Sequence, residues 1–255
     1  MVLGRDRLIM GNEERKRRLR TVFQQIGAFR GIKILLARLV ARFLDPGVIP
    51  SYSQFGEDRV IGHIFNDKYN GYYVDVGCNH PILYSNTWKL YLNGWRGMVI
   101  DANEELIREY KKVRPNDISV QEVISDSEEC LDYYFSNNSN LISGVGAFVD
   151  DRWGRDVDNC KVVKVRPRSL DDLFLKYGVP RDFDLLSIDV EGHELNVLRS
   201  MNFSIYRPRL IIVEIHDLNI LGMEENPIYK TLNENGYALN SIVGPSFFFL
   251  VNDLS

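Results

Sequence analysis

Four ionisable side chains follow one short apolar run in the second half of the chain. The run at residues 185–188 leads directly into Asp189, Glu191, His193 and Glu194. Carboxylates this close together repel one another unless a cation, a proton or a substrate hydroxyl compensates their charge, so the cluster indicates a functional site. The structural alternative is that Asp189 or Glu191 caps the N-terminus of a helix while Glu194 faces solvent.

Two further carboxylates stand at the ends of earlier apolar runs. The sequence reads VDVGCNHP over residues 74–81 and IDAN over residues 100–103. At the end of the second strand of an α/β sheet, Asp101 can accept hydrogen bonds from both hydroxyls of a ribose, which predicts an adenosine-containing cofactor. Helix capping by Asp101 is the structural alternative. No G-x-G-x-x-G phosphate loop is present, because Asn79 and Pro81 stand where glycines are needed, and this favours S-adenosylmethionine over NAD.

A metal ion is a second use for these carboxylates. The apolar run at residues 210–215 ends in a further polar group, Glu214, His216 and Asp217. Oxygen ligands from Asp189, Glu214 and Asp217 would suit Mg²⁺. No second aspartate stands directly beside Asp189 or Asp217, which argues against this variant.

Apolar runs alternate with helical periodicity from Tyr72 onward, a pattern typical of a parallel sheet with crossover helices. An antiparallel insertion is predicted at residues 131–135 and 161–165. The last two strands, at 238–243 and 247–251, are joined by only three residues, so they must form an antiparallel hairpin. The other predicted strands are 72–76, 98–100, 119–124, 185–188 and 210–215, with helices near 85–93, 103–113, 170–177, 193–200 and 226–235.

The composition is that of a globular protein. The chain has 255 residues, 45% hydrophobic and 26% charged, and a net charge of −4. These values exclude disordered, collagenous and low-complexity classes. Three cysteines without a C-x-x-C pair predict a reducing compartment, and the sequence shows neither a signal peptide nor a membrane span, so we expect a cytoplasmic protein.

The small net charge is an average over two unlike parts. Residues 1–44 carry eleven Lys and Arg against three acids, a charge of +8, whereas the remainder carries −12. Apolar residues at three- and four-residue steps predict a basic amphipathic helical extension over residues 1–50, followed by a catalytic domain at 51–255. Such a segment suits an anionic membrane surface, which would place the protein at the inner membrane face, or equally a partner helix or a second copy. Nucleic acid is disfavoured because the body of the protein is acidic.

Six short motifs follow one another along the chain: YSQFGED at 52–58, VDVGCNHP at 74–81, SNT at 85–87, GWRG at 94–97, SLDD at 169–172 and IDVEGHE at 188–194. In this order they resemble the FkbM family of S-adenosylmethionine-dependent methyltransferases. The resemblance covers about residues 52–217 and implies a Rossmann-like α/β class I methyltransferase fold, whose seven-stranded, mostly parallel sheet has an antiparallel last strand. It implies methylation of a hydroxyl oxygen on a sugar, a glycan or a natural product; a lipid-linked glycan would suit a membrane location.

The resemblance also implies roles for individual residues around the cofactor. Asp75 and Gly77 would hold the methionine end of S-adenosylmethionine and Asp101 its ribose, while Ser125 or Asp126 would approach the adenine.

Further residues would complete this cofactor site. Gln54, Glu57 and Asp58 would close it from the N-terminal side, with a helix start capped by Ser53 as their structural alternative. The remaining residues expected to face the cofactor are Asn79, Ser85 and Asn86, and for the last two a helix cap is the alternative.

The chemistry needs a base, because an aliphatic hydroxyl has a pKa near that of water, about 15.7. Asp189 is expected nearest the transferring methyl group, with Glu191 or His193 as the base.

The long polar segment 136–160 is expected to recognise the acceptor. Two other classes stay open from the sequence: an NAD-dependent oxidoreductase, and a non-catalytic scaffold that retains the fold.

Overall fold

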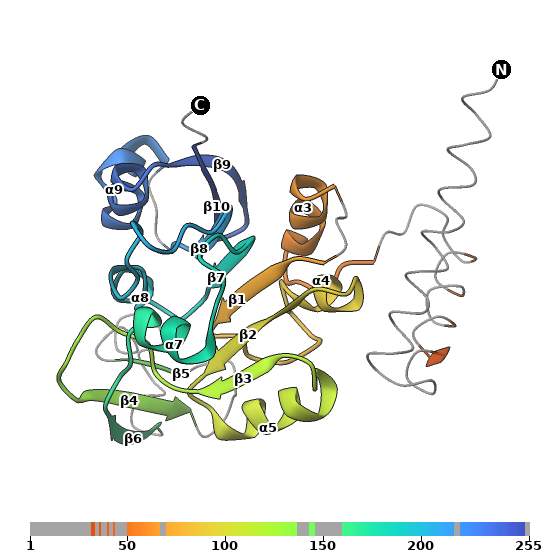
Figure 1. Cartoon of the computed structure of the whole chain (residues 1–255), viewed down its shortest axis with the longest axis horizontal. Coiled ribbons are helices and arrows are strands. Elements are labelled where there is room, and N and C mark those ends of the chain that lie inside the picture. Colours follow the sequence, from red (N-terminus) through yellow and green to blue (C-terminus); the bar gives the residue numbers. More distant parts are fainter. Residues whose placement is uncertain are drawn as a thin grey trace.

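A seven-stranded sheet forms the centre of the computed structural model (Figure 1). The model describes residues 32, 33, 36, 40, 43, 50–66, 70–136, 143–145, 160–216 and 220–252. The strand order is β3-β2-β1-β7-β8-β10-β9. The bounds are β1 Tyr72–Val76, β2 Arg96–Asp101, β3 Ile118–Gln121, β7 Leu185–Ile188, β8 Leu210–Glu214, β9 Tyr237–Val243 and β10 Ser246–Val251.

The strand directions confirm the predicted class I methyltransferase topology. Strands β3, β2, β1, β7 and β8 pair in parallel, whereas β10 is antiparallel to both β8 and β9. The short turn at Gly244 makes this reversal necessary, because a parallel crossover needs a dozen or more residues. The order also reverses direction between β1 and β7, so the carboxyl ends of these two strands flank the crevice where open α/β sheets bind ligands.

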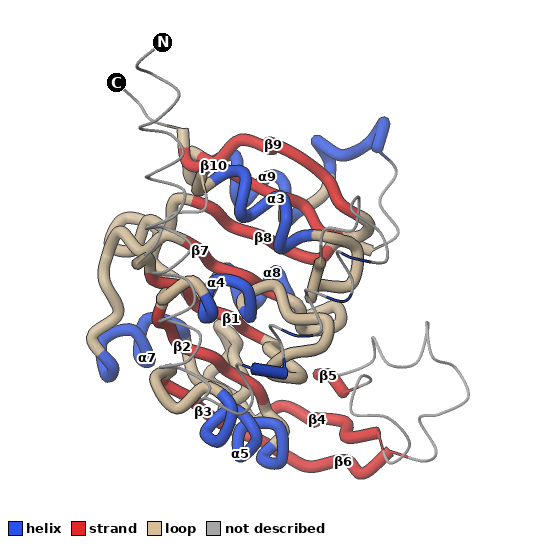
Figure 2. Tube along the Cα trace, turned by 90° about the vertical axis from the view of Figure 1, so that its right-hand side faces the viewer, coloured by secondary structure: helices blue, strands red, loops and turns tan. Residues whose placement is uncertain are grey.

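Helices cover both faces of the sheet, as Figure 2 shows. One face packs against α3 (Glu57–Ile64), α4 (Trp88–Leu92) and α5 (Glu104–Val113) around Tyr73 and Val99. The other packs against α7 (Leu170–Tyr177), α8 (Glu194–Arg199) and α9 (Pro227–Glu234), around Val74 and Ile100. Neighbouring residues of one strand therefore pack into the two cores on opposite faces of the sheet. This explains why most positions of β1 and β2 are apolar. A 3₁₀ helix, η2 (Ile220–Glu225), precedes α9.

The predicted antiparallel insertion is present as a second, three-stranded sheet. It has the order β5-β4-β6, with bounds β4 Leu131–Ser136, β5 Ser143–Val145 and β6 Cys160–Val165. Tyr133 and Val145 pack with Val123, which follows β3. The insertion therefore covers the end of the main sheet near β3. Most of the expected acceptor segment, 136–160, lies outside the described residues.

Of the six described residues of the predicted N-terminal extension, Pro50 lies outside any helix and the other five are helical. Four of them are apolar, and their exposed fractions are 48% for Ile32, 55% for Leu36, 57% for Val40 and 88% for Phe43. Steps of three and four residues place these side chains on one face of a helix. Among the described residues, no helix is both long and apolar enough to cross a membrane.

Candidate active site

Two adjoining cavities open at the carboxyl ends of the central strands, and four residues line both of them: Gly77, Asn79, Asp189 and Glu191. The first, which we name the β2 cavity, extends past the end of β2 towards the three-stranded sheet. The second, which we name the β8 cavity, encloses about 440 Å³ and extends towards the end of β8 and the start of α4. Parallel strands bring their carboxyl ends to one edge, so residues more than 100 positions apart meet here.

Asp101 lies in the β2 cavity, as expected for a ribose ligand. Its Oδ2 accepts a hydrogen bond from the amide of Asn79 at 3.0 Å, and its Oδ1 accepts one from the amide of Asn103 at 2.8 Å. Helix α5 is capped instead by Asn103, whose side chain accepts from the amide of Glu105. Capping therefore does not explain Asp101, and each oxygen keeps a lone pair for a ligand hydroxyl. Burial raises the pKa of Asp101, against the effect of these two amides.

Ser125 and Asp126, the expected adenine contacts, are not among the residues that line the β2 cavity. Neither lines a described cavity; the β2 cavity is lined instead by Glu122, Val123 and Ile124. Strand β3 ends at Gln121, three residues before the predicted end, so the chain crosses the cavity earlier.

Ser125 and Asp126 fasten the start of α8 instead. The hydroxyl of Ser125 lies 3.0 Å from Nε2 of His193, and Asp126 accepts a hydrogen bond from Nδ2 of Asn196 at 2.8 Å. His193 is buried, lines only the β2 cavity, and has its pKa lowered by burial. The prediction that His193 is the base receives no support from this placement.

Asp75 lines the β8 cavity, and hydrogen bonds position its carboxylate. Its Oδ2 accepts a hydrogen bond from the hydroxyl of Thr87 at 2.6 Å, and that hydroxyl accepts one from the guanidinium of Arg114 at 2.8 Å. Burial raises the pKa of Asp75, while the hydrogen bond from Thr87 and the charge of Arg114 act in the opposite direction. Arg114 is fully buried, and the sequence pattern did not single it out.

Some of the other predicted cofactor residues line the β8 cavity and some do not. Gln54, Ser85 and Asn86 line the β8 cavity. Ser85 also accepts hydrogen bonds from the amides of Thr87 and Trp88, so its capping alternative holds as well.

Glu57 and Asp58, expected to close the cofactor site from the N-terminal side, are not among the residues that line either cavity. The carboxylate of Glu57 accepts from the amide of Phe55 and the hydroxyl of Ser246. Asp58 accepts from the hydroxyls of Ser51 and Ser53 and from the amide of Tyr52. Both carboxylates therefore tie the segment before α3 to the body of the protein.

Gly77 brings β1 and β7 into close approach between the two cavities. Its φ is +75°, and a Cβ atom at this position would lie 1.7 Å from the carbonyl oxygen of Asp189. The obstacle is backbone, which no side-chain rotation can relieve. Only glycine therefore fits here.

Substitution Gly77→Ala is expected to separate the ends of β1 and β7 and weaken cofactor binding at least tenfold. Gly178→Ala is the matched control, because Gly178 has a φ of +67° with nothing within 4 Å of the added Cβ. The control should cost only the backbone strain, about 1 kcal/mol. Urea unfolding and cofactor titration of both variants test this; equal behaviour of the two would contradict it.

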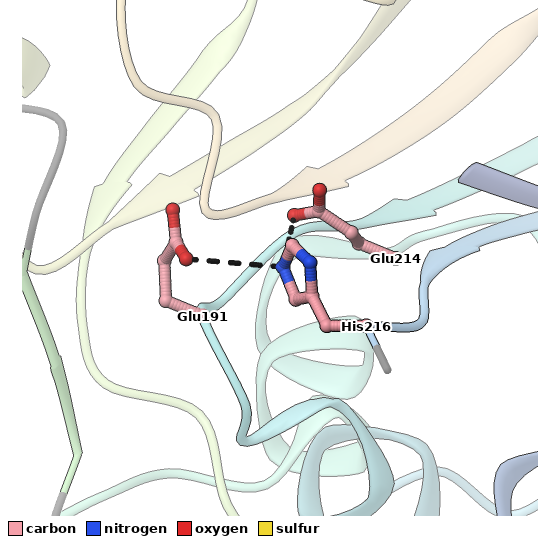
Figure 3. A group of neighbouring side chains, drawn as sticks. All are labelled: Glu191, Glu214 and His216. Atoms are coloured by element: carbon pink, nitrogen blue, oxygen red, sulfur yellow. Dashed lines mark ion pairs between the residues drawn. The ribbon is translucent and has the colours of Figure 1, made fainter. Parts of the chain in front are cut away.

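Glu191, Glu214 and His216 converge in the β8 cavity, as Figure 3 shows. Nε2 of His216 lies 3.2 Å from a carboxylate oxygen of Glu214 and 3.9 Å from one of Glu191. One ligand atom from each residue lies within 4.8 Å of the others, so the group could hold a divalent cation. Of the predicted metal ligands, Glu214 belongs to this group, Asp189 stands beside it, and Asp217 lies outside the described residues.

The turn that carries Glu191 is strained and held in place. Glu191 has a φ of +55°, in the left-handed region that side chains rarely adopt. Glu194 is buried, and its Oε1 accepts hydrogen bonds from the amides of Val190 and Gly192 at 3.3 and 2.9 Å. The expectation that Glu194 faces solvent is therefore wrong: it fixes the turn that presents Glu191 to the cavity. Strain of this kind persists where surrounding contacts enforce it, commonly at functional sites.

Asp189 stands among these carboxylates. Desolvation, a hydrogen bond with Glu214 and repulsion by Glu214, Glu191 and Glu194 together raise the pKa of Asp189 well above its usual range. Asp189 is exposed on the cavity side, where water weakens the first of these effects, whereas the neighbouring carboxylates remain. A bound cationic ligand would lower this repulsion, so the site is suited to positive charge.

Comparison with known proteins agrees with this geometry. The model of the methyltransferase FkbM domain matches residues 75–239, which is more than half of the chain. No curated protein sequence matches the chain.

Similar solved structures include a TehB-like SAM-dependent methyltransferase from Corynebacterium glutamicum, 13% identical over 84% of this chain and 94% of the other, with a TM-score of 0.38. The methyltransferase FkbM from Methylobacillus flagellatus is 11% identical over 71% of this chain and 44% of that protein, with a TM-score of 0.39. From the family match, the chain belongs to the FkbM family of S-adenosylmethionine-dependent methyltransferases.

Proposed function

We propose that this enzyme methylates a hydroxyl oxygen of a sugar, glycan or natural-product acceptor, with the reacting oxygen in the β8 cavity. The observation that carries the proposal is the meeting of Asp189, Glu191, Glu214 and His216 in one cavity that adjoins the carboxylate of Asp101, the expected ribose ligand. The two cavities share a wall, so a nucleoside in one and a hydroxyl in the other would be neighbours.

The residues present fit S-adenosylmethionine and disfavour a dinucleotide. Acids line both cavities, and neither cavity wall contains a Lys or Arg among the described residues. S-adenosylmethionine carries a sulfonium and an ammonium, which these acids attract, whereas the diphosphate of NAD would be repelled. Asp101 would hold the ribose, Val123 and Ile124 would pack against the adenine, and Asp75 would take the ammonium.

When bound, S-adenosylmethionine supplies an electrophilic methyl group. This chain then has to align the acceptor oxygen and remove its proton, and alignment itself provides much of the barrier reduction. Glu191 is the proposed base, because its carboxylate faces the β8 cavity and its turn is rigidly held. His216 lies 3.9 Å from it, paired with Glu214, and can pass the proton onward.

Tritiated methyl transfer to an extract of the source organism tests the proposed function. Label should appear in a product whose methyl group resists mild base, because a sugar methyl ether is stable where a carboxyl methyl ester is hydrolysed. Label confined to base-labile products, or no label from protein that binds the cofactor, would contradict the proposal. The second result would favour a non-catalytic scaffold.

We also propose that the N-terminal segment binds anionic lipid. Four described side chains, Ile32, Leu36, Val40 and Phe43, form an exposed apolar face, and the surrounding 44 residues carry a charge of +8. Apolar burial combined with attraction to anionic headgroups is how such segments bind at a membrane surface. This would hold the catalytic domain near lipid-linked acceptors.

The full-length protein should sediment with vesicles of mixed phosphatidylglycerol and phosphatidylcholine, and less with phosphatidylcholine alone. Replacement of the four apolar residues by serine should leave at least tenfold more protein in the supernatant. Sodium chloride at about 1 M should weaken sedimentation, because it shortens electrostatic range to about 3 Å. Equal sedimentation of both proteins would refute lipid binding by this face.

A further inference from the structure

An open groove of about 740 Å³ lies beside the β8 cavity, and the proposed base does not account for it. We name it the α3 groove; Gln54 lines both the groove and the β8 cavity. The end of β9 contributes Val243, and the neighbouring strand β10 pairs with the end of β8 at Glu214. A large acceptor bound in the α3 groove could therefore extend into the β8 cavity and its carboxylates.

One wall of the α3 groove carries uncompensated positive charge. Arg59 and His63 both line the groove and are exposed, and their four-residue spacing places them on one face of α3. Neither side chain forms an ion pair with any part of the chain that the structure describes. The cavity beyond is lined with acids, so the positive charge of Arg59 is separate from the catalytic carboxylates. An anionic group of a ligand is the chemical partner that Arg59 fits.

The same groove presents an aromatic ring that is held in position. Phe55 is 52% exposed although it is large and apolar. Its ring packs closely on the backbone of Gly244, where an added Cβ atom would lie 2.8 Å from the ring. Gly244 has a φ of +58°, so glycine is favoured for two reasons. A fixed ring in a partly polar groove is a typical recognition element for a ligand with an apolar face, such as a sugar ring.

We propose that the α3 groove binds the acceptor, and that the acceptor is an anionic saccharide: its sugar ring lies on Phe55 and its phosphate or carboxylate on Arg59, beside the imidazole of His63. This inference rests on the proposed methyl transfer. Phosphate and carboxylate share the same anionic chemistry, and the products of the reaction distinguish them.

The test is to fractionate the tritium-labelled product of the extract reaction on an anion exchanger. Labelled product should be retained. Release by alkaline phosphatase identifies a phosphate monoester, release only by phosphodiesterase together with phosphatase identifies a phosphodiester, and retention after both treatments identifies a carboxylate. A neutral labelled product overturns the anionic acceptor while leaving methyl transfer intact. Absence of any labelled product would instead refute methyl transfer itself, so the two failures are distinct.

Variants of the groove locate the binding. Arg59→Gln should lower labelling at limiting extract about tenfold, and Arg59→Glu further, with the cofactor dissociation constant unchanged. Arg181→Gln is the matched control, because Arg181 is exposed and precedes β7. It therefore lies at the amino-terminal end of the parallel strands, opposite the end that carries the cavities. Phe55→Ala should lower labelling and Phe55→Tyr should preserve it. Equal labelling by Arg59→Glu and the wild-type protein would overturn the assignment. A change in the molecular mass of the Phe55→Ala protein in solution would also overturn it, because the groove would then bind a second copy of the chain.

Discussion

Replacement of Arg114 by methionine should lower the free energy of unfolding by about 3–5 kcal/mol, the range typical of removing one partner from a buried ion pair. The guanidinium of Arg114 is fully buried and donates to the carbonyl of Pro81 at 2.9 Å, the hydroxyl of Ser85 at 2.6 Å and that of Thr87 at 2.8 Å. It also lies 3.8 Å from the buried carboxylate of Asp117. Methionine would leave these groups without their donor.

The same substitution should also weaken cofactor binding, because Arg114 helps to position Asp75. Arg114 bonds to Thr87, and Thr87 bonds to Asp75, which lines the β8 cavity. Arg114 is therefore a positioning residue that touches no ligand itself. Cofactor affinity should fall at least tenfold in Arg114→Met under conditions where the variant is still folded.

Stability loss in Arg114→Met should depend on pH. Burial raises the pKa of Asp117 to about 6, and Arg114 limits this rise. Without Arg114 the pKa of Asp117 in the folded protein rises further, while its pKa in the unfolded chain stays near the ordinary value of 3.8. A raised folded pKa of an acid costs stability above the unfolded pKa, so the variant should lose more stability at pH 8 than at pH 5.

Urea unfolding at both pH values measures this loss. Arg108→Met is the matched control on the same helix, because Arg108 is exposed and pairs with Glu104 across one turn. Exposed pairs contribute about 0.3–0.5 kcal/mol. A similar loss in the two variants would show that the buried network does not stabilise the protein.

Glu191→Gln should lower the rate of methyl transfer about 100-fold or more while cofactor affinity changes less than threefold. The substitution keeps shape and removes the negative charge, and loss of a general base commonly costs 10²- to 10⁴-fold. Asp189→Asn should lower the rate similarly, because Asp189 lines both cavities at their junction. Glu104→Gln, an exposed change on α5, is the control. Near-normal rates in both site variants would refute these assignments.

Chelation distinguishes a base from a metal ligand in the same cluster. With Glu191 as the base, activity should survive exhaustive treatment with EDTA. Loss of activity that returns on addition of Mg²⁺ or Mn²⁺ would assign Glu191, Glu214 and His216 to a divalent cation instead. His216→Asn adds a second readout, because loss of a proton relay alters the pH profile of the rate.

Much of the fold and part of the site could be predicted from the sequence. Strand runs that end in carboxylates were enough to place Asp75, Asp101 and Asp189 at one edge of a parallel sheet, and the three-residue connection was enough to require a terminal hairpin. These features depend on local pattern and on sheet geometry alone.

The remaining features depend on contacts that no local pattern reports. The wall at Glu122–Ile124 was missed because β-forming residues continue past the point where pairing with β2 stops. Tyr133 reaches the β2 cavity from the three-stranded sheet, whose docking is a long-range contact. Arg114 reads in sequence as one basic residue among several, because its partners lie 27 to 33 positions earlier.

His216 illustrates the same limit within the site. Sequence spacing gave His193 and His216 similar weight, and His193 stood nearer to the acidic cluster. In the structure, His193 occupies the N-cap position of α8 and lies beside Ser125, whereas His216 follows β8 into the cavity with Glu214. The choice between them depends on where the backbone turns after each strand.

Calorimetric titration of the full-length protein with S-adenosylmethionine tests the central claim most directly. The account predicts one site per chain with micromolar affinity, no heat with NAD, and at least tenfold weaker binding in Asp101→Asn, whose folding is checked by its unfolding curve. Binding of NAD in place of S-adenosylmethionine, or unchanged affinity in folded Asp101→Asn, would contradict the account.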